Sequence, residues 1–168
     1  AFYTPDASVT RKCHYLHALI ETGRTDEAMP AVEEIWLHGR SRPKACDPVF
    51  DAWTSAGQRT EARTWRRIEK AMYARQPRLA RYLSRSLPAQ DRQWVETWIT
   101  LLAEPTRALD AKLVRGKHRY REAMLAHAVR QLARSDRPAA LDAWKTLQTR
   151  YRFSATQKRV TDHLIARR

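Results

Sequence analysis

Apolar residues recur at intervals of three and four along most of the chain, which is the pattern of amphipathic helices. One clear example comprises Ala28, Val32, Ile35 and Trp36. Nothing alternates with a period of two over a useful length, so no sheet is predicted. We expect helices over about 8–22, 26–38, 47–56, 60–75, 78–86, 89–103, 105–114, 119–135, 138–151 and 154–167. The pattern therefore predicts an all-α protein.

The glycines and prolines support these helix limits. Gly23, Gly39, Gly57 and Gly116 each follow a helical stretch, and we expect each to end a helix in a left-handed backbone conformation. The prolines fall mostly in the junctions or in first helical turns, where a missing N–H does no harm. Short joints of this kind are typical of packed helix hairpins.

A weak internal repeat indicates how the helices assemble. The segment that begins at Thr22 resembles the one at Ala56, 34 residues later, and a third segment at Ser135 shares the turn and the later bulky residue. This spacing is the period of tetratricopeptide helix pairs. About ten short helices cannot each bury a face alone, so they must stack. We predict an α-α superhelix or solenoid of degenerate tetratricopeptide-like pairs over residues 1–168.

Composition is that of a folded, strongly basic chain. Hydrophobic residues make up 43% of the 168 positions, charged residues 30%, and the net charge is +14. No apolar run approaches the length of a membrane span, and the first residues lack the pattern of a signal peptide. Because the chain does not begin with Met, we interpret it as a mature protein or an excised fragment. Such a charge would attract nucleic acid, anionic lipid or an acidic cell-wall polymer, but the scattered arginines favour solvated helix faces.

The two cysteines have three possible states, namely bridged, metal-bound or buried and free. Cys13 and His17, spaced i, i+4, could form a zinc site with Cys46 and either His14 or His38. The chain has no C-x-x-C, H-x-x-x-H or H-E-x-x-H motif, which argues against a metal. A disulfide fits better, because neighbouring antiparallel helices would bring the two positions within bridging range. It would persist only in an oxidising compartment.

No other pattern indicates catalysis or a cofactor. There is no nucleophile elbow and no glycine-rich phosphate loop. Pairs of carboxylates, such as Glu33 with Glu34 or Glu96 with Glu104, are expected to form i, i+4 ion pairs along their helices. The histidines share no spacing and are interpreted as surface or core residues. Five of the six tryptophans lie on predicted buried faces and are expected to fill the core: the six are Trp36, Trp53, Trp65, Trp94, Trp98 and Trp144.

The segment from Trp36 to Trp53, WLHGRSRPKACDPVFDAW, is the most specific part of the chain. It resembles the W-L-x-G-x-S-x-P-x-A-C-D-x-x-F-x-x-W run in the superhelical domain of soluble lytic murein transglycosylases. The likeness extends upstream through Cys13 and Gly23 and fades after about residue 105. Downstream it includes Gly57, Arg67-Ile68, Ala71-Met72 and Leu87-Pro88-Ala89. The motif positions that we expect to be structural are Trp36, Gly39, Pro43, Asp47, Phe50 and Trp53.

The resemblance implies a helical domain of U shape, with a bridge between Cys13 and Cys46. The family is periplasmic and cleaves the glycan strand of peptidoglycan with a single Glu, leaving a 1,6-anhydro end. That Glu belongs to an E-S motif in a separate lysozyme-like domain, with G-L-M-Q and A-Y-N-A-G-P runs, and none of these occurs here. The resemblance therefore implies a non-catalytic scaffold fragment, with no cofactor, whose partners are peptidoglycan and its own catalytic domain.

Two other functions are compatible with a helical repeat. One is a free-standing tetratricopeptide-like adaptor that binds a protein partner on its concave face. The other is a basic repeat protein that reads RNA one base at a time. No positions of such a code are apparent, and a disulfide would be out of place in the cytoplasm. We therefore expect no nucleic-acid partner.

Overall fold

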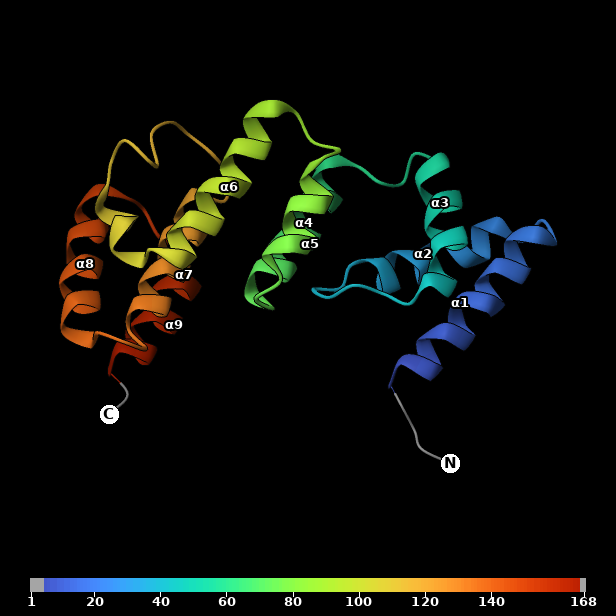
Figure 1. The fold of residues 1–168 in the computed structure, drawn as a ribbon, viewed down its shortest axis with the longest axis horizontal. Helices are drawn as coiled ribbons and strands as arrows, with labels where there is room; N and C mark the ends of the chain where they lie inside the picture. Colours follow the sequence, from blue (N-terminus) through green and yellow to red (C-terminus); the bar gives the residue numbers. More distant parts are fainter. Residues whose placement is uncertain (1–4, 167–168) are drawn as a thin grey trace. The chain divides into compact units, whose positions relative to one another are not determined.

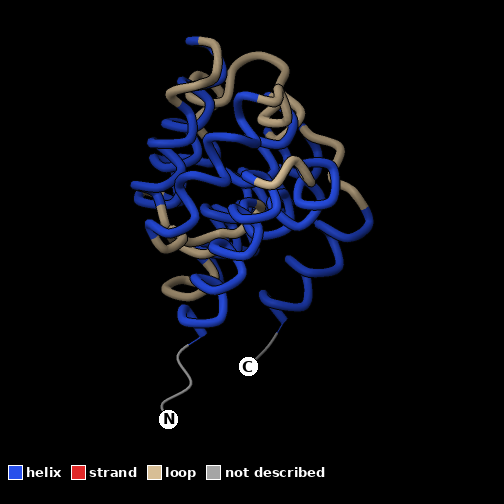
Figure 2. Tube along the Cα trace, turned by 90° about the vertical axis from the view of Figure 1, so that its right-hand side faces the viewer, coloured by secondary structure: helices blue, strands red, loops and turns tan. Residues whose placement is uncertain are grey.

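The computed structural model describes residues 5–166, and this part of the chain consists of helices joined by short loops (Figure 1). The α-helices are α1 (Pro5–Glu21), α2 (Thr25–Trp36), α3 (Asp47–Ser55), α4 (Glu61–Tyr73), α5 (Pro77–Ser84), α6 (Ala89–Ala103), α7 (Arg121–Leu132), α8 (Arg137–Arg150) and α9 (Ala155–Ala166). Two 3-10 helices, η1 (Lys44–Cys46) and η2 (Pro105–Leu109), complete the set. Residues 5–166 contain no strand (Figure 2), and the predicted all-α fold class is confirmed.

One predicted helix is wrong, the one over 105–114. Only η2 forms there, and a turn follows it. The carboxylate of Asp110 accepts a hydrogen bond from the backbone N–H of Lys112, at 2.9 Å. This local bond gives the backbone an alternative to a helix, which explains the early end. The last position of the predicted helix 154–167 lies outside the described residues.

The chain divides into two compact units, which we call unit 1 (residues 1–92) and unit 2 (residues 93–168). The division falls inside α6. Each unit has its own buried apolar core. The assignment of residues 1–168 to one superhelical domain stays a prediction.

Unit 1 is built from helix hairpins. Helix α1 packs on α2, α4 packs on α5, and α3 lies against both α1 and α2. Val32, Ile68 and Val49 are fully buried between these helices, and Trp53 is 1% exposed. Helix α4 begins at a side-chain cap, because Thr60 Oγ1 accepts a hydrogen bond from the backbone N–H of Arg63.

Three helices of unit 1 end in the same way, with a residue at positive φ. Gly23 (φ 80°) ends α1 and Gly57 (φ 71°) ends α3, while Arg75 (φ 56°) takes the same place after α4. Gly116 also has a positive φ, as predicted. The prediction was wrong for Gly39, which is not among the positive-φ residues of the described chain. The role of Gly39 is steric, because a Cβ atom at this position would clash with the backbone of Lys70.

The 34-residue spacing seen in the sequence relates Gly23 to Gly57, the two helix ends. Helices α2 and α4 begin 36 residues apart, at Thr25 and Glu61, because the joint before α4 is longer. The buried Val32 of α2 therefore corresponds to the buried Ile68 of α4. The repeated unit therefore consists of a helix-ending turn and the helix that follows it, and the joint between the two varies in length.

Unit 2 is organised around α7. This helix packs against α8, α9 and η2, and its Met124, Leu125, Ala128 and Val129 are fully buried. Such burial on several sides marks a central helix. All six tryptophans of the chain are at most 7% exposed, so the predicted core role is confirmed and extends to the sixth.

Candidate functional site

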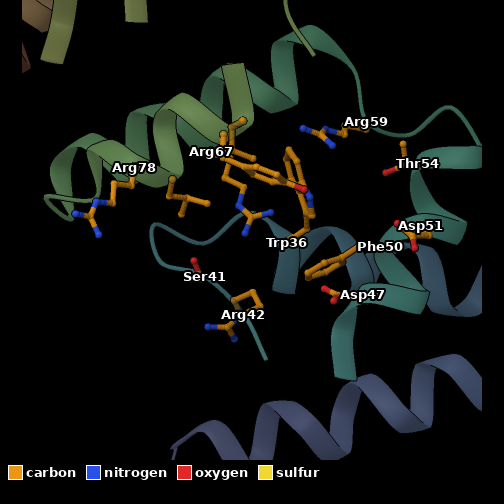
Figure 3. Close-up of a pocket in the computed structure, with 13 residues that line it drawn as sticks. Trp36, Ser41, Arg42, Asp47, Phe50, Asp51, Thr54, Arg59, Arg67 and Arg78 are labelled. Atoms are coloured by element: carbon orange, nitrogen blue, oxygen red, sulfur yellow. The ribbon is translucent and has the colours of Figure 1, made fainter. Parts of the chain in front are cut away.

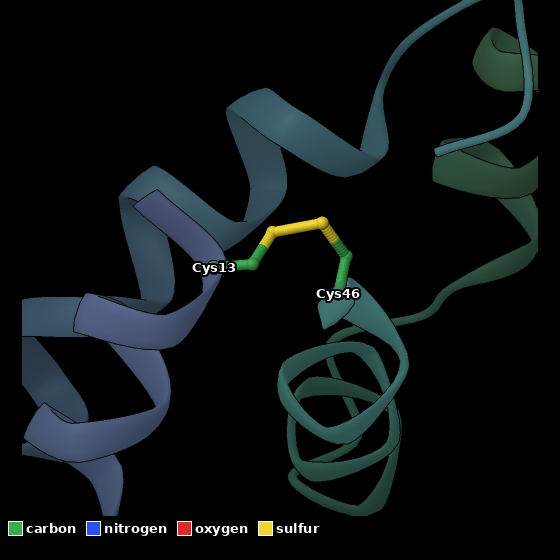
Figure 4. Close-up of a disulfide and its surroundings, with 2 residues drawn as sticks. All are labelled: Cys13 and Cys46. Atoms are coloured by element: carbon green, nitrogen blue, oxygen red, sulfur yellow. A yellow bond between two sulfur atoms is a disulfide. The ribbon is translucent and has the colours of Figure 1, made fainter. Parts of the chain in front are cut away.

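The two cysteines are joined in a disulfide that ties α1 to η1 at the start of α3 (Figure 4). Both are fully buried, and their Cα atoms are 5.0 Å apart. The bridge uses the thiols that a zinc site would have needed. In residues 5–166 no three His, Cys, Asp or Glu side chains gather as a metal site would require.

A pocket of about 570 Å³ opens in unit 1, between the end of α2, the following loop, and helices α3, α4 and α5 (Figure 3). Its lining is unusual because four arginines and three aromatic side chains share it. We call it the arginine pocket. Its lining residues are Trp36, Ser41, Arg42, Asp47, Phe50, Asp51, Thr54, Arg59, Arg67, Arg78, Leu79, Tyr82 and Leu83.

The motif segment builds one wall of the arginine pocket. Trp36, Asp47 and Phe50 line it, and the rings of Trp36 and Trp53 pack at 4.9 Å behind the wall. Pro43 precedes η1, and its carbonyl accepts the backbone N–H of Cys46 at 2.9 Å. These contacts place the motif residues, whose predicted structural roles stay predictions.

Gly39 lets the loop of the motif approach the end of α4. A Cβ atom at this position would lie 2.5 Å from the backbone oxygen of Lys70. That distance is shorter than any normal contact, and the opposing atom is backbone, so only glycine fits. The close approach places the loop that carries Ser41 and Arg42 beside α4.

Arg67 is the central cation of the arginine pocket. Its side chain comes from α4, is 5% exposed, and has its guanidinium 4.7 Å from the ring of Trp36 and 5.8 Å from that of Phe50. Figure 3 shows the group pointing toward these rings. Its Nε donates to the carbonyl of His38 at 3.4 Å. Within residues 5–166, no carboxylate lies within ion-pair distance of it.

The electrostatic cost of this arrangement is visible in the pKa of Arg67. Burial, and to a smaller extent the nearby charges of Arg59 and Arg42, together lower that pKa to about 10. The guanidinium still carries its proton at neutral pH. A buried cation that rests on ring faces and one carbonyl is a group that an anion would stabilise.

Arg63, one helical turn earlier on α4, differs from Arg67 because it has a carboxylate partner. It pairs with Glu33 of α2 at 2.9 Å, and its guanidinium lies 5.6 Å from the ring of Trp53. Glu34 likewise pairs with Lys12 of α1 at 3.2 Å. The predicted pairing of these glutamates along their own helix is wrong, because cations of neighbouring helices come closer.

The other arginines of the pocket are also incompletely satisfied. Arg59 donates through Nη2 to Ser86 Oγ at 3.2 Å, and its guanidinium lies 5.7 Å from the ring of Trp36. Among the described residues, the Nε atoms of Arg42 and Arg59 are the buried side-chain polar atoms without a hydrogen-bond partner. Two donors at one place, beside the buried cation of Arg67, therefore lack the acceptors that buried polar groups normally have.

Two carboxylates share the lining, yet neither neutralises these arginines. Asp47 and Asp51 both lie on α3, and within the described chain neither forms an ion pair with an arginine of the pocket. Asp47 occupies the first turn of α3, where the helix dipole favours a negative charge. Figure 3 shows Asp51 across the pocket from Arg78. The pocket keeps a cationic side that is open to a ligand.

This chemistry is suited to holding an anion. The lining contains no His, Cys, Lys or Glu, and its cations are all arginines, which keep their charge at neutral pH. Arginine forks and aromatic faces are suited to holding a planar anion.

The arginines of the pocket are candidate functional residues that the sequence did not reveal. They were interpreted as solvated helix faces because they are scattered along the chain. A signal existed for Arg67, which lies on the same face of α4 as Thr64, Ile68 and Ala71, all buried. A charged residue inside an apolar stripe is the pattern that predicts a buried cation. For Arg42, Arg59 and Arg78 the sequence holds no comparable signal.

No family model matches the chain. The sequence relatives and the similar solved structures, however, agree on one family. The soluble lytic murein transglycosylase of Escherichia coli K12 is 31% identical over 125 residues, which cover 74% of this chain and 19% of that protein. The chain therefore spans about a fifth of the length of the curated relatives that it matches.

Solved structures extend the match to nearly the whole chain. An inactive variant of the lytic transglycosylase Slt from Pseudomonas aeruginosa has a TM-score of 0.81 at 27% identity, covering 98% of this chain and 27% of that one. The 70 kDa soluble lytic transglycosylase of Escherichia coli has a TM-score of 0.74 at 27% identity, covering 94% of this chain and 26% of that one. The chain is homologous to the soluble lytic murein transglycosylases, and its helices match their superhelical domain.

Proposed function

Starting from this homology, we propose that the chain is a non-catalytic helical scaffold segment of a periplasmic soluble lytic transglycosylase and that it helps to bind peptidoglycan. The observation that carries the proposal is the TM-score of 0.81 to a lytic transglycosylase over 98% of the chain. In this proposal the cleavage of the glycan strand belongs to a lysozyme-like domain of the parent protein. The helical segment holds that domain and the strand.

The disulfide supports the periplasmic location. A buried bridge between Cys13 and Cys46 persists in an oxidising compartment and is rare in the cytoplasm. Counting free thiols in protein isolated from its own cell tests this part. We expect none, and two free thiols per chain would contradict the location.

The charge supports a role toward peptidoglycan. A chain with a net charge of +14 attracts acidic polymers, and the arginine pocket gives that attraction a defined place. None of the helices in residues 5–166 is long and apolar enough to cross a bilayer.

Incubation of the purified chain with peptidoglycan sacculi tests the proposal directly. We expect the chain to sediment with the sacculi at 150 mM salt and to release no anhydromuropeptides. Release of these products would contradict the non-catalytic role. A chain that stays in the supernatant would contradict the binding role. Sacculi pretreated to neutralise their carboxylates provide the matched control, and we expect them to bind less of the chain.

A further inference from the structure

We infer that the arginine pocket is a carboxylate-binding site, and that its ligand is the peptide part of peptidoglycan rather than the sugar backbone. The carboxylate site follows from the pocket alone. The choice of peptidoglycan rests on the proposed function above. The two parts can therefore fail separately.

The first argument is the convergence of unmet donors. Arg67 is 5% exposed and has no carboxylate partner in the described chain, and the buried Nε atoms of Arg42 and Arg59 have no hydrogen-bond partner. A buried donor without an acceptor destabilises a fold, and two such donors beside a buried, unpaired cation need a common explanation. One anion in the pocket would supply acceptors to all three arginines.

The second argument concerns the kind of anion. Carboxylates match the planar fork of a guanidinium with two parallel hydrogen bonds. A pocket of about 570 Å³ is much larger than a bare inorganic ion and has the size of sites for small organic ligands. Trp36, Phe50 and Leu79 add apolar surface beside the cations. The lining therefore fits an organic carboxylate with an apolar stem.

The third argument selects the peptide. In peptidoglycan the lactyl carboxyl of the muramic acid is joined to the peptide by an amide bond, so the peptide-bearing sugar strand carries no charge there. The free carboxylates belong to the peptides. A cationic pocket of this size is accordingly expected to bind the carboxylates of the peptide and not the uncharged sugars. Tyr82, which also lines the pocket, is 59% exposed and offers an aromatic surface to such a peptide.

A titration with a defined fragment of the peptide tests the inference. The probe is N-acetyl-L-alanyl-D-glutamate, which has two free carboxylates, and its controls are the uncharged diamide and inorganic phosphate. Binding to the full chain is measured by isothermal titration calorimetry at 150 mM salt. We expect the diamide and phosphate each to bind at least about tenfold more weakly than the dicarboxylate, because charge-assisted hydrogen bonds are lost or misfitted.

Arginine variants locate the site. Arg42→Gln and Arg78→Gln remove one pocket cation each, and we expect each to weaken binding by about tenfold. Arg11→Gln removes one charge from the exposed surface of α1 and is expected to leave binding unchanged within about twofold. Circular dichroism and thermal unfolding of each variant verify that it is folded. Should a pocket variant fail to fold, Arg42→Lys keeps the charge but removes the fork, and it is expected to bind more weakly than the wild type.

Each outcome decides between the two parts. Equal binding of dicarboxylate and diamide, or equal loss in the Arg11 and Arg42 variants, overturns the carboxylate site. Equal binding of phosphate overturns the organic ligand. If sacculi bind the chain but the dipeptide does not, the inference fails and the proposed function stands. If the dipeptide binds through the arginines but sacculi do not bind, the carboxylate site stands and the proposed function fails.

Discussion

Units 1 and 2 differ in whether their buried polar side chains have partners. In unit 2 the buried Trp98 donates its Nε1–H to His127 at 3.3 Å, and Trp144 donates its Nε1–H to Asp162 at 2.6 Å. In unit 1 a buried guanidinium, that of Arg67, has no carboxylate partner among the described residues. Native interiors normally satisfy their polar groups, so an exception is informative. The difference supports the proposed binding site in unit 1.

Unit 1 also has the stronger restraints around that site. The Cys13–Cys46 bridge fixes the start of α3, and the Arg63–Glu33 ion pair joins α4 to α2. Both restraints border the elements that line the arginine pocket. These restraints hold the pocket in place, and a ligand that binds only the folded chain would add to its stability.

The disulfide is expected to give the largest effect. Replacing both Cys13 and Cys46 by Ala should lower the free energy of unfolding of unit 1 by about 3 to 4 kcal/mol, because the unfolded chain regains the freedom of a long loop. Hydrogen exchange measures the loss region by region. We expect faster exchange in α1 to α3 and little change in α7. Equal losses in both units would contradict their separate cores.

Gly39 should give the next largest effect. Gly39→Ala places a Cβ against the backbone oxygen of Lys70 and is expected to destabilise the fold by about 1 to 3 kcal/mol. Chemical denaturation measures it. Gly39 has no positive φ, so this effect is steric, and a change below about 0.5 kcal/mol would show that the loop moves away freely.

The two arginines of α4 provide a sharper contrast, since they should respond with opposite signs. Arg63→Met breaks a partly buried ion pair and should destabilise the fold by about 1 to 2 kcal/mol. Arg67→Met removes a buried cation without a carboxylate partner and should stabilise it by about 1 kcal/mol, because the desolvation cost exceeds the loss of contacts to the rings. Urea denaturation of both variants tests the signs. Destabilisation by Arg67→Met beyond about 1 kcal/mol would contradict our interpretation of the pocket.

The smallest effect is a pH dependence. The pKa of Arg67 is about 10 in the folded chain, well below the ordinary value of an arginine, so above pH 10 the unfolded state holds this proton more firmly than the folded state. Stability linked to this group therefore rises with pH. Between pH 9 and pH 11, the wild type should gain about 1 kcal/mol relative to Arg67→Met. Denaturation of both proteins across this range measures the gain, and a constant difference would contradict the lowered pKa.

Much of the fold could be predicted from the sequence, for reasons visible in particular residues. The three-and-four spacing of Val32, Ile35 and Trp36 predicted α2, and the left-handed glycines Gly23 and Gly57 marked real helix ends. The predicted helix over 105–114 is wrong because the carboxylate of Asp110 accepts a hydrogen bond from the backbone N–H of Lys112, which competes with the helix and which apolar spacing does not encode.

The site was only partly predictable. Three motif residues for which the sequence predicted structural roles, Trp36, Asp47 and Phe50, line the pocket. The arginines come from four separate segments, two loops, α4 and α5, and only the packing of these segments brings them together. Gly39 illustrates the same limit, since its need for space depends on the position of Lys70.

The most direct test of the central claim is a titration followed through the indole N–H signals of two tryptophans in the full chain. Trp36 lines the arginine pocket in unit 1, and Trp144 is 1% exposed in the core of unit 2. On addition of N-acetyl-L-alanyl-D-glutamate, we predict a saturable shift of the Trp36 signal and none of the Trp144 signal. The uncharged diamide should shift neither. A Trp36 signal that stays in place at saturating dicarboxylate, or that moves equally with the diamide, would contradict the account.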